Sequence, residues 1–575
     1  MREEGKNREG RWWKMLVTMI CIITICVILY FFYVKPTMER EELNKKFAEF
    51  KKRYEEKKAQ GYDVAEAEAF MRKAKHAFEA NKYEEAEKFL EKAFKLLEIA
   101  PPPISTKAET ICMDGKDNDG DGFTDDEDSD CWIREGALFE MIQQGKEGTL
   151  SFKEQEEMLP LLAEMGIKTI YLTPIWRYKQ GTSLWRYCIQ DYYQIDSAKG
   201  TAEDFKHFIE TAHSYGIKVI LDMVTAHTSP GRYIYEHHKD WILRDKYGNL
   251  VYCWPNKHWG YAVDRSNPEV IDYFTKIAKF YIDNYGIDGW RMDAIGTQYC
   301  TSAVEDCPQP VEGEHNSKNL LKSIKSAIGN DKVLYLEWHY LGRVYLLQKG
   351  VEEEGGCPVP NPIPCSVVLP ELNEFAEASY SYEFGKCFIP NILTGKVSSQ
   401  DLVNFFKDEC TYYGKARGRF LMTHDVGFKF YMENKRFHKP GAVLITTVPG
   451  FPHIYHREIF PQGDIAPINR EMFDFYKKLL SIRSKYPALR YGSIENVWAG
   501  GDNTLAYMRE YDEEKVVIVI NFQGRNVTSI LNLPFPEGNT LIDVLNNESF
   551  YVRNPKNFEI TIPAYTGRIL ILEKK

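Results

Sequence analysis

Two patterns of hydrophobic and polar residues alternate along most of the chain. From Gly136 onward, short apolar stretches are separated by longer segments in which apolar residues recur every three or four positions. The first pattern predicts buried strands and the second predicts amphipathic helices. The predicted strands are Ala137–Met141, Thr169–Thr173, Lys218–Val224, Gly289–Asp293, Val333–Glu337, Ser379–Phe384, Phe420–Thr423 and Ala442–Thr446. Eight strands with helices between them predict a TIM barrel, the α/β fold written (β/α)8, whose active site lies at the C-terminal ends of its strands.

A second domain follows the predicted barrel. The helical pattern stops after about Arg490, and alternating strands such as Val516–Asn521 and Arg568–Leu572 replace it. Strands of this kind predict a small β-sandwich domain over residues 491–575. The catalytic barrel is predicted over residues 133–490, with a short insertion at about 228–260 after its third strand.

The N-terminal part contains an apolar run without charged residues, from Met15 to Val34. A helix of about 20 such residues is long enough to cross a bilayer. Basic residues precede the run, so the positive-inside rule places residues 1–14 in the cytoplasm and the remainder outside the cell. We expect a single-pass protein of the cell membrane that contacts the lipid bilayer through residues 15–34. A cleaved signal peptide is the alternative interpretation.

Residues 35–100 carry a helical pattern. One apolar stripe lies within residues 43–54 and a second within 78–97. Residues 81–87 resemble part of a tetratricopeptide unit, although a single unit is too short for a solenoid. We expect a helical hairpin that serves as a stalk, and the binding of a protein partner through this stalk is a second interpretation. Three prolines at 101–103 end the helices.

A dense acidic motif lies in the linker predicted over residues 101–132. Its alternate carboxylates and its glycine fit an EF-hand-type loop, in which oxygen ligands wrap one Ca²⁺ and the glycine permits a sharp turn. No clear helix is predicted beside the loop. We expect a structural Ca²⁺ ion here, and a solvated acidic turn is the alternative. The ligands would be Asp117, Asp119, Asp121, Asp125 and Asp128.

The chain has twelve cysteines, of which Cys21 and Cys26 lie in the apolar run. In an exported protein, the even number that remains predicts disulfide bonds. Reduced, buried thiols are the alternative. The expected pairs are Cys112/Cys131, which bracket the acidic motif, Cys300/Cys307 and Cys357/Cys365, which close short loops, and, from the cysteines left over, Cys188/Cys253 and Cys387/Cys410.

Composition narrows the classes of function. The net charge of −10 gives no indication of nucleic-acid binding. Aromatic residues make up 14% of the chain, which suits stacking on sugars but also suits a large core.

One segment is a candidate for chemistry. Arg291 and Asp293 are two residues apart on a predicted strand, so their side chains point to the same side. The arginine is expected to lower the pKa of Asp293 and keep it ionised. An ionised, positioned carboxylate can act as a nucleophile at a sugar carbon, and a structural salt bridge is the alternative.

Four motifs lie at the ends of the third, fourth, fifth and seventh predicted strands. In order and spacing they resemble the four signature regions of glycoside hydrolase family 13, the α-amylase family, and the resemblance covers about residues 136–575. The segments Tyr261–Ser266 and Pro449–Tyr455 support it, and the second is expected after the eighth strand. The motifs are Asp222-Met-Val-Thr-Ala-His227, Gly289-Trp-Arg-Met-Asp-Ala294, Tyr335-Leu-Glu-Trp338 and Phe420-Leu-Met-Thr-His-Asp425.

The resemblance implies a role for each matching residue. Asp293 would be the nucleophile, Glu337 the general acid/base and Asp425 a carboxylate that stabilises the transition state. The apolar neighbours of Glu337 are expected to raise its pKa. The residues implied in orienting or binding are Arg291, which would orient Asp293, Asp222, which would support the site, and His227, His424 and Tyr187, which would bind the sugar at the cleavage subsite.

The chain departs from the pattern of the family at several places. Ala226 stands where the family usually has an asparagine that binds calcium, so we do not expect that calcium site. Ala294-Ile-Gly-Thr297 replaces the Ala-x-Lys-His of typical α-amylases, so the subsites on the leaving-group side are expected to differ. Trp290 is more like members that act on pullulan, cyclodextrins and short maltodextrins.

These features predict a retaining α-glycosidase that hydrolyses α-glucans of the starch, maltodextrin, pullulan or cyclodextrin type at the outer cell surface. Two alternatives stay open. One is an α-glucan transglycosylase that uses the same covalent intermediate. The other is a non-catalytic, amylase-like ectodomain that partners a membrane transporter, which the presence of all three carboxylates disfavours.

Overall fold

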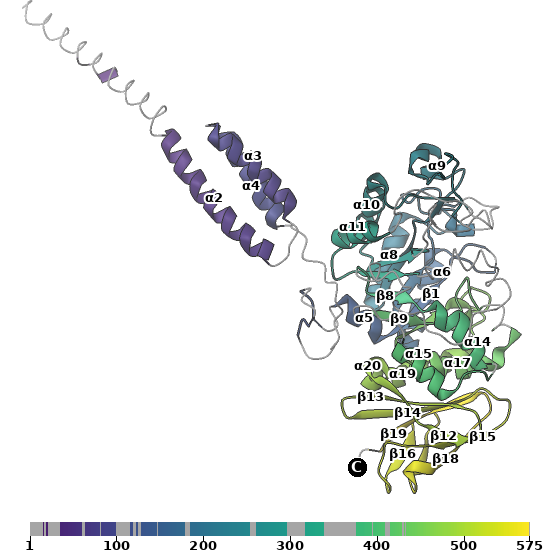
Figure 1. Ribbon diagram of the computed structural model, residues 1–575. Helices are drawn as coiled ribbons and strands as arrows, with labels where there is room; N and C mark the ends of the chain where they lie inside the picture. The colour runs from purple at the N-terminus through teal and green to yellow at the C-terminus, as the bar shows by residue number, and fades with distance from the viewer. Residues whose placement is uncertain are drawn as a thin grey trace, which may run out of the picture. The chain divides into compact units, whose positions relative to one another are not determined.

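The computed structural model divides the chain into two compact units, Met1–Pro103 and Ile104–Lys575, and each is described by itself. Figure 1 colours the chain from purple at the N-terminus to yellow at the C-terminus. The structure describes residues 15, 19–20, 35–59, 64–80, 82–98, 116–118, 122–124, 128–146, 148–178, 185–253, 260–295, 317–337, 375–393, 395–408, 415–427, 431 and 433–573.

The N-terminal unit contains three packed helices: α2 (Lys35–Ala59), α3 (Ala65–Glu79) and α4 (Tyr83–Glu98). Helix α4 packs against both of the others, and apolar residues at helical spacing form their shared core. Helices occur here as predicted, but the described residues of this unit form three packed helices rather than the two of a hairpin. The sequence between α2 and α3 contains one glycine and no proline, and a single glycine is a weak stop signal.

The expected localisation in the cell membrane is corrected by the structure. Among the residues that the structure describes, no helix combines the length and the apolar character needed to cross a bilayer. The run at 15–34, on which the expectation rested, lies outside the described residues except for Met15, Met19 and Ile20. The membrane assignment is therefore withdrawn.

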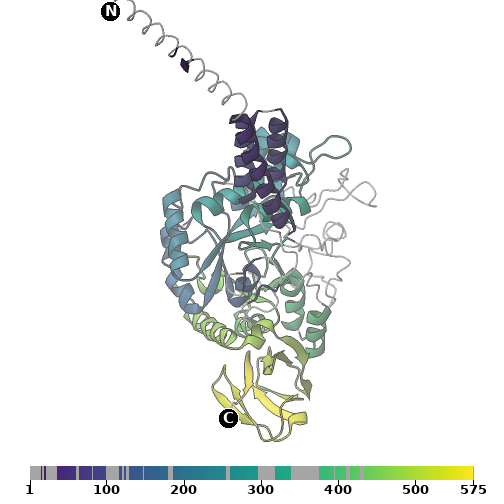
Figure 2. The ribbon, with the colours of Figure 1, turned by 90° about the vertical axis from the view of Figure 1, so that its left-hand side faces the viewer.

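Eight parallel strands close into a barrel in the second unit, and helices surround them (Figures 1 and 2). This closed parallel arrangement confirms the predicted TIM barrel. In order around the barrel, the strands are β1 (Ala137–Met141), β10 (Phe451–Tyr455), β9 (Ala416–Arg419), β8 (Ala378–Tyr380), β7 (Val333–Leu336), β6 (Gly289–Asp293), β3 (Lys218–Val224) and β2 (Ile167–Leu172).

The last two predicted strands were misplaced. The seventh strand is β9, which precedes the predicted 420–423 and reads Ala-Arg-Gly-Arg, with no apolar signal. The eighth strand is β10, whereas the predicted 442–446 lies in helix α17 (His438–Thr447). Nearly every residue of α17 is buried, and periodicity alone does not distinguish a short apolar run in a buried helix from a strand.

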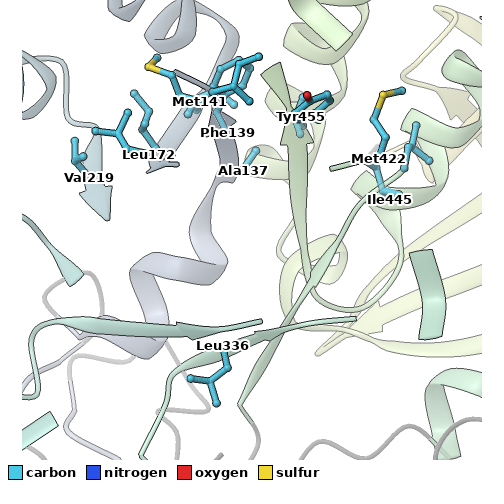
Figure 3. Close-up of a cluster of buried hydrophobic side chains, with 14 of the residues drawn as sticks. Ala137, Phe139, Met141, Leu172, Val219, Leu336, Met422, Ile445 and Tyr455 are labelled. Atoms are coloured by element: carbon cyan, nitrogen blue, oxygen red, sulfur yellow. The ribbon is translucent and has the colours of Figure 1, made fainter. Parts of the chain in front are cut away.

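Helices cover the outside of the barrel and bury an apolar layer against the strands. Figure 3 shows part of this layer, including Phe139, Leu172 and Val219. Local sequence signals place several helix ends: Thr201 caps α8, and Gly286 ends α10 with a φ of 72°. The helices around the barrel, besides α17, are α6 (Phe152–Glu156), α7 (Leu159–Met165), α8 (Ala202–Ser214), α10 (Pro268–Tyr285), α11 (Lys318–Ile328), α14 (Ile389–Leu393), α15 (Ser399–Asp408), α18 (His456–Ile459), α19 (Arg470–Lys485) and α20 (Pro487–Tyr491), with a π-helical turn at η6 (Glu383–Phe388) and three-residue helical turns at η3 (Trp185–Tyr187) and η8 (Lys435–Phe437).

Helix α5 (Ser129–Glu135) closes the N-terminal end of the barrel. The side chain of Asp128 caps this helix, and Trp132 and Ile133 pack into the apolar interior of the barrel. A buried ion pair of 2.8 Å joins Asp130 to Lys415, which precedes β9. A helix therefore follows the acidic motif directly, contrary to the expectation that no clear helix flanks it.

A short segment follows the third strand. It contains a two-stranded sheet, β4 (His227–Thr228) with β5 (Tyr261–Ala262), together with α9 (Tyr233–His237) and η4 (Lys239–Trp241). Helix α9 is visible at one end of the barrel in Figure 1.

Two antiparallel sheets form the C-terminal β-sandwich (Figure 1). In strand β14, alternate side chains enter two different cores: Val517 and Val519 face the second sheet, while Ile518 and Ile520 join the core of the barrel. The six-stranded sheet runs β11 (Ser493–Asn496), β13 (Leu505–Tyr511), β14 (Glu514–Asn521), β19 (Thr566–Leu572), β16 (Thr540–Asp543) and β17 (Glu548–Tyr551), and the three-stranded sheet runs β12 (Trp498–Gly501), β15 (Val527–Leu531) and β18 (Phe558–Ile562), which follows the turn η9 (Pro555–Asn557).

Two buried arginines bind main-chain carbonyls where the sandwich meets the barrel. Arg509 of β13 donates to the carbonyl oxygens of Thr447 and Leu489. Arg483 of α19 donates to those of Thr446 and Leu489. Burial lowers the pKa of each guanidinium to about 9. The joint is therefore a packed and hydrogen-bonded interface.

Candidate active site

Arg291 is the centre of a buried charge cluster at the C-terminal ends of the strands. Its side chain is 0% exposed. It donates to both carboxylate oxygens of Asp222 at 2.8 and 2.9 Å and to Asp293 at 2.8 Å. Its second terminal nitrogen lies 2.8 Å from Glu337. One guanidinium thus binds three carboxylates from β3, β6 and the end of β7, which pair in that order in the sheet.

Asp222 also accepts hydrogen bonds from two tyrosines. The hydroxyl groups of Tyr171 and Tyr187 donate to the same oxygen at 2.6 and 2.7 Å. Burial raises the pKa of Asp222, and Arg291 and the two hydroxyl groups oppose this rise. The carboxylate holds Tyr187 in place beside the cluster, and Tyr171 is a contact that the sequence analysis did not identify.

The pKa of Asp293 is shifted in the direction opposite to the prediction. Burial raises the pKa of Asp293 well above its ordinary value, and the neighbouring carboxylates of Glu337 and Asp222 raise it further. Arg291 lowers it, as the sequence predicted, but its charge is shared among three carboxylates. The prediction was wrong because the sequence does not show how many acids one arginine serves.

Glu337 lies in polar rather than apolar surroundings. One of its oxygens accepts from the main-chain N–H of Ala294 at 2.7 Å and lies against Arg291. The other accepts from the hydroxyl of Tyr382 at 2.7 Å. Ala294 has a φ of 45°, in the left-handed region, and this turn after β6 aims its N–H at Glu337. The expected apolar setting is therefore not found, and Tyr382 is a further contact that the sequence analysis missed.

His424 joins the charge cluster to a carboxylate on the first strand. Its Nε2 lies 2.8 Å from the hydroxyl of Tyr187 and 3.2 Å from Asp425. Its Nδ1 donates to Glu140, and its ring stacks on that of Tyr187 at 5.2 Å. Burial lowers the pKa of His424, but Asp425 and Glu140 raise it well above its ordinary value. The two carboxylates therefore favour the protonated ring of His424.

The remaining expected residues differ in exposure. The side chain of Asp425 is 55% exposed, unlike the other carboxylates of the cluster. His227 of β4 is buried and contacts the main chain of Tyr187, and burial lowers its pKa well below the ordinary value. The structure thus brings together all the residues that the sequence analysis expected to orient or bind: Arg291, Asp222, His227, His424 and Tyr187 lie with or directly beside Asp293, Glu337 and Asp425.

The acidic motif is described only in part. Asp117 accepts from the main-chain N–H of Gly122 at 3.0 Å, and Asp128 caps α5, while Asp119, Asp121 and Asp125 lie outside the described residues. Within the described ranges, no group of three or more His, Cys, Asp or Glu side chains could hold a metal ion.

The expected disulfide bonds have mixed outcomes. The thiols of Cys188 and Cys253 are not joined, so that pairing was wrong. Cys131 is disulfide-bonded, and its expected partner Cys112 lies outside the described residues. The side chains of the other expected pairs also lie outside them: Cys300, Cys307, Cys357, Cys365, Cys387 and Cys410.

Two family models match the chain. The alpha amylase catalytic domain matches residues 152–263, and the maltogenic amylase C-terminal domain matches residues 495–569. The first match ends before β6, so the site residues from Arg291 onward lie beyond it.

Curated relatives show the same similarity over a longer stretch. Alpha-amylase 2 of Dictyoglomus thermophilum is 25% identical over 410 residues, which cover 65% of this chain and 64% of the relative. A cyclomaltodextrinase of Thermoanaerobacter pseudethanolicus is 24% identical, covering 72% and 70%. Neopullulanase 2 of Thermoactinomyces vulgaris is 24% identical, covering 72% and 69%. The chain thus spans about two thirds of the length of these relatives.

Solved structures share the fold. An Anoxybacillus α-amylase superposes with a TM-score of 0.60 at 22% identity, covering 77% of this chain and 99% of that one. An α-amylase from Lactobacillus plantarum gives a TM-score of 0.61 at 18% identity, covering 77% and 100%. Together with the family models and the curated relatives, these matches show that the barrel and the C-terminal domain are similar to those of alpha-amylase-family glycoside hydrolases.

Proposed function

We propose that the protein hydrolyses α-glucans with retention of configuration at the anomeric carbon. The observation that supports this most is the binding of Asp222, Asp293 and Glu337 by Arg291 at 2.8 to 2.9 Å. Two carboxyl groups on one guanidinium are close neighbours, and a retaining mechanism needs its acid and its nucleophile about 5–5.5 Å apart.

In the proposed first step, Asp293 in its ionised form attacks the anomeric carbon, and Glu337 in its protonated form gives its proton to the leaving glycosidic oxygen. The C–O bond to the leaving sugar breaks as a glycosyl ester with Asp293 forms. In the second step Glu337 takes a proton from water, which attacks the same carbon and releases Asp293. Glu337 must turn from Arg291 and Ala294 to reach the substrate, since both of its oxygens bind protein groups here.

The other residues would bind and orient the sugar. Asp425 is the most exposed carboxylate of the group and is suited to contact sugar hydroxyl groups. The protonated ring of His424 and the hydroxyl of Tyr187 would stabilise the negative charge of Asp425. His227 is kept neutral by burial and would serve as a hydrogen-bond partner for a hydroxyl group. Asp222 holds Arg291 and Tyr187 in position.

The proposed substrate class rests on the relatives, which are an α-amylase, a cyclomaltodextrinase and a neopullulanase. We propose an α-glucan of the maltodextrin, cyclodextrin or pullulan type. A transglycosylase would use the same intermediate and differ only in passing the sugar to another sugar.

The purified full chain tests the proposal when it is incubated with soluble starch, pullulan, cyclodextrin and maltotriose. Asp293→Asn is the inactive variant, and Asp283→Asn, at an exposed aspartate of α10, is the matched control. We expect only the wild type and Asp283→Asn to release products. NMR should show that the products first form as the α-anomer. Longer sugars would indicate transglycosylation. The absence of turnover by folded wild-type protein would reject the proposal.

We also propose that residues 117–128 bind one structural Ca²⁺ ion. The hydrogen bond from Gly122 to Asp117 joins the first and sixth positions of the loop, and φ at Gly122 is 99°. Titration of the EDTA-treated full chain with CaCl2 should show one site that Asp117→Asn weakens and Asp502→Asn, at a surface ion pair, does not. Equal heats of Ca²⁺ binding in the wild type, Asp117→Asn and Asp502→Asn would contradict the proposal. A protein partner for the three helices of the N-terminal unit stays a prediction.

A further inference from the structure

Glu140 is a buried carboxylate that neither the sequence motifs nor the proposed reaction uses. It lies on β1, where Phe139 and Met141 pack into the outer apolar layer. Alternation along the strand points Glu140 into the barrel. Its side chain is 0% exposed. Placing a carboxylate there requires partners for both of its oxygens.

Two histidines supply these partners. One oxygen accepts from the main-chain N–H of His424 at 3.1 Å and from its ring Nδ1. The other oxygen accepts from Nε2 of His453 at 3.0 Å. His453 in turn accepts from the hydroxyl of Tyr335 at 3.0 Å, because its Nδ1 carries no proton when Nε2 donates and the ring is neutral. Burial lowers the pKa of His453, in agreement with the neutral ring.

The directions of these hydrogen bonds fix the state of His424. A carboxylate can only accept, so Nδ1 of His424 carries a proton. Tyr187 donates its own proton to Asp222 at 2.7 Å and therefore accepts from Nε2 of His424 at 2.8 Å. Both ring nitrogens then carry protons, as in an imidazolium. A chain of hydrogen bonds thus runs from Glu140 through His424, Tyr187 and Asp222 to Arg291.

The charges around His424 come from several elements. Glu140 on β1 faces one ring nitrogen, and Asp425 with Tyr187 faces the other. His453 lies on the far side of Glu140. On the other side of Tyr187, the next charged groups are Asp222, Arg291, Asp293 and Glu337. Asp425 is half exposed, so its effect is screened by solvent, while Glu140 is fully buried. Asp425 and Glu140 both raise the pKa of His424, and Glu140 is the one of the two that is buried away from solvent.

We infer that Glu140 is a positioning residue for the reaction, which fixes the ring of His424 and keeps it cationic beneath the sugar-binding mouth of the barrel. The inference rests on the proposed hydrolase function. Glu140 acts through His424 because it is fully buried and both of its oxygens bond to histidines. His453 and Tyr335 hold the second oxygen of Glu140 and so set its orientation.

The variant Glu140→Gln tests the charge, because glutamine keeps the size and can still accept from His424. We expect kcat/KM to fall about 10- to 100-fold, as for outer contacts of other catalytic groups. Loss of the counter-charge lowers the pKa of His424, so the alkaline limb of the pH profile should move to lower pH by about one unit or more. The matched control is Glu458→Gln, a fully buried glutamate on α18 that bonds to Tyr476 and should leave this limb in place.

A readout independent of activity is the titration of His424 in full chain labelled with ¹⁵N-histidine, assigned with His424→Gln. Titration at a lower pH in Glu140→Gln than in the wild type supports the inference. An unchanged titration, or a fall in activity with an unmoved limb, would overturn it. If Glu140→Gln does not fold, Glu140→Asp carries the test: it keeps the charge, so kcat should fall while the limb stays. Lack of α-glucan turnover by the wild type would reject the proposed function, but not the effect of Glu140 on His424 that the titration measures.

Discussion

Replacing Arg291 by lysine tests whether one planar cation holds the site together. Lysine keeps the positive charge but has a single nitrogen, which cannot take the place of two guanidinium nitrogens that bind three carboxylates. At least two charge-assisted hydrogen bonds are lost, each worth about 1.5–3 kcal/mol. The free energy of unfolding should therefore fall by about 3–6 kcal/mol at neutral pH, similar to the loss when a buried ion pair is broken.

The loss should depend on pH, and its sign follows from the carboxylates. Burial already raises the pKa of Asp222 and Asp293, and weaker contact with a cation raises both further. A carboxyl group whose pKa is raised by folding favours the folded state while it is protonated, and this contribution is lost as the pH rises through the folded value. The difference between Arg291→Lys and the wild type should therefore be small near pH 4 and grow toward neutral pH.

Urea unfolding followed by tryptophan fluorescence, at a series of pH values, measures this difference. The surface variant Arg525→Lys, at an exposed ion pair with Asp502, is the matched control and should change the free energy of unfolding by less than about 1 kcal/mol. A loss in Arg291→Lys that is equally small, or that does not vary with pH, would refute the reasoning that three carboxylates depend on one guanidinium.

Further predictions concern the pH profile and the barrel interior. In Asp222→Asn, removal of one neighbouring negative charge lowers the pKa of Asp293, so the acidic limb of kcat/KM should move to lower pH; an unmoved limb would show that Asp222 does not act on Asp293. In Gly418→Ala, the new methyl group would lie 2.1 Å from the hydroxyl of Tyr335, so urea unfolding should show a loss of about 1–3 kcal/mol that adding Tyr335→Phe partly restores. A larger loss in the double variant would contradict this steric account.

The sequence predicted the parts of the site that lie in recognisable motifs. Arg291 and Asp293 share a strand, and their common direction follows from the alternation of side chains, so their contact could be predicted. The partners contributed by other strands could not. Glu140 stands as the one charged residue in Ala-Leu-Phe-Glu-Met, which was a signal, but its contacts with His424 and His453 are separated by about 300 residues of sequence. The pKa of Asp293 depends on burial and on Glu337 and Asp222 from neighbouring strands, so the direction of its shift could not be predicted from the sequence either.

The fold was predictable wherever a strand is apolar and faces a helix. Strand β9 was misplaced because Arg417 and Arg419 are buried by hydrogen bonds to Ser379 and Ser381 rather than by apolar contact. Helix α17 was taken for a strand because it is apolar on all sides. One of its sides faces the barrel and the other faces β14 and β19 of the sandwich.

The double-sided packing of β14 limits how this protein could be recombined. A barrel separated from its C-terminal sheets would expose the apolar surface of α17 to water and would leave the carbonyls of Thr447 and Leu489 without Arg509. A C-terminal sheet taken from another protein would need matching side chains at positions 518 and 520, along with an arginine at 509. The sandwich therefore cannot be exchanged without its contacts on the barrel, and grafting experiments should match α17, Arg509 and positions 518 and 520 together.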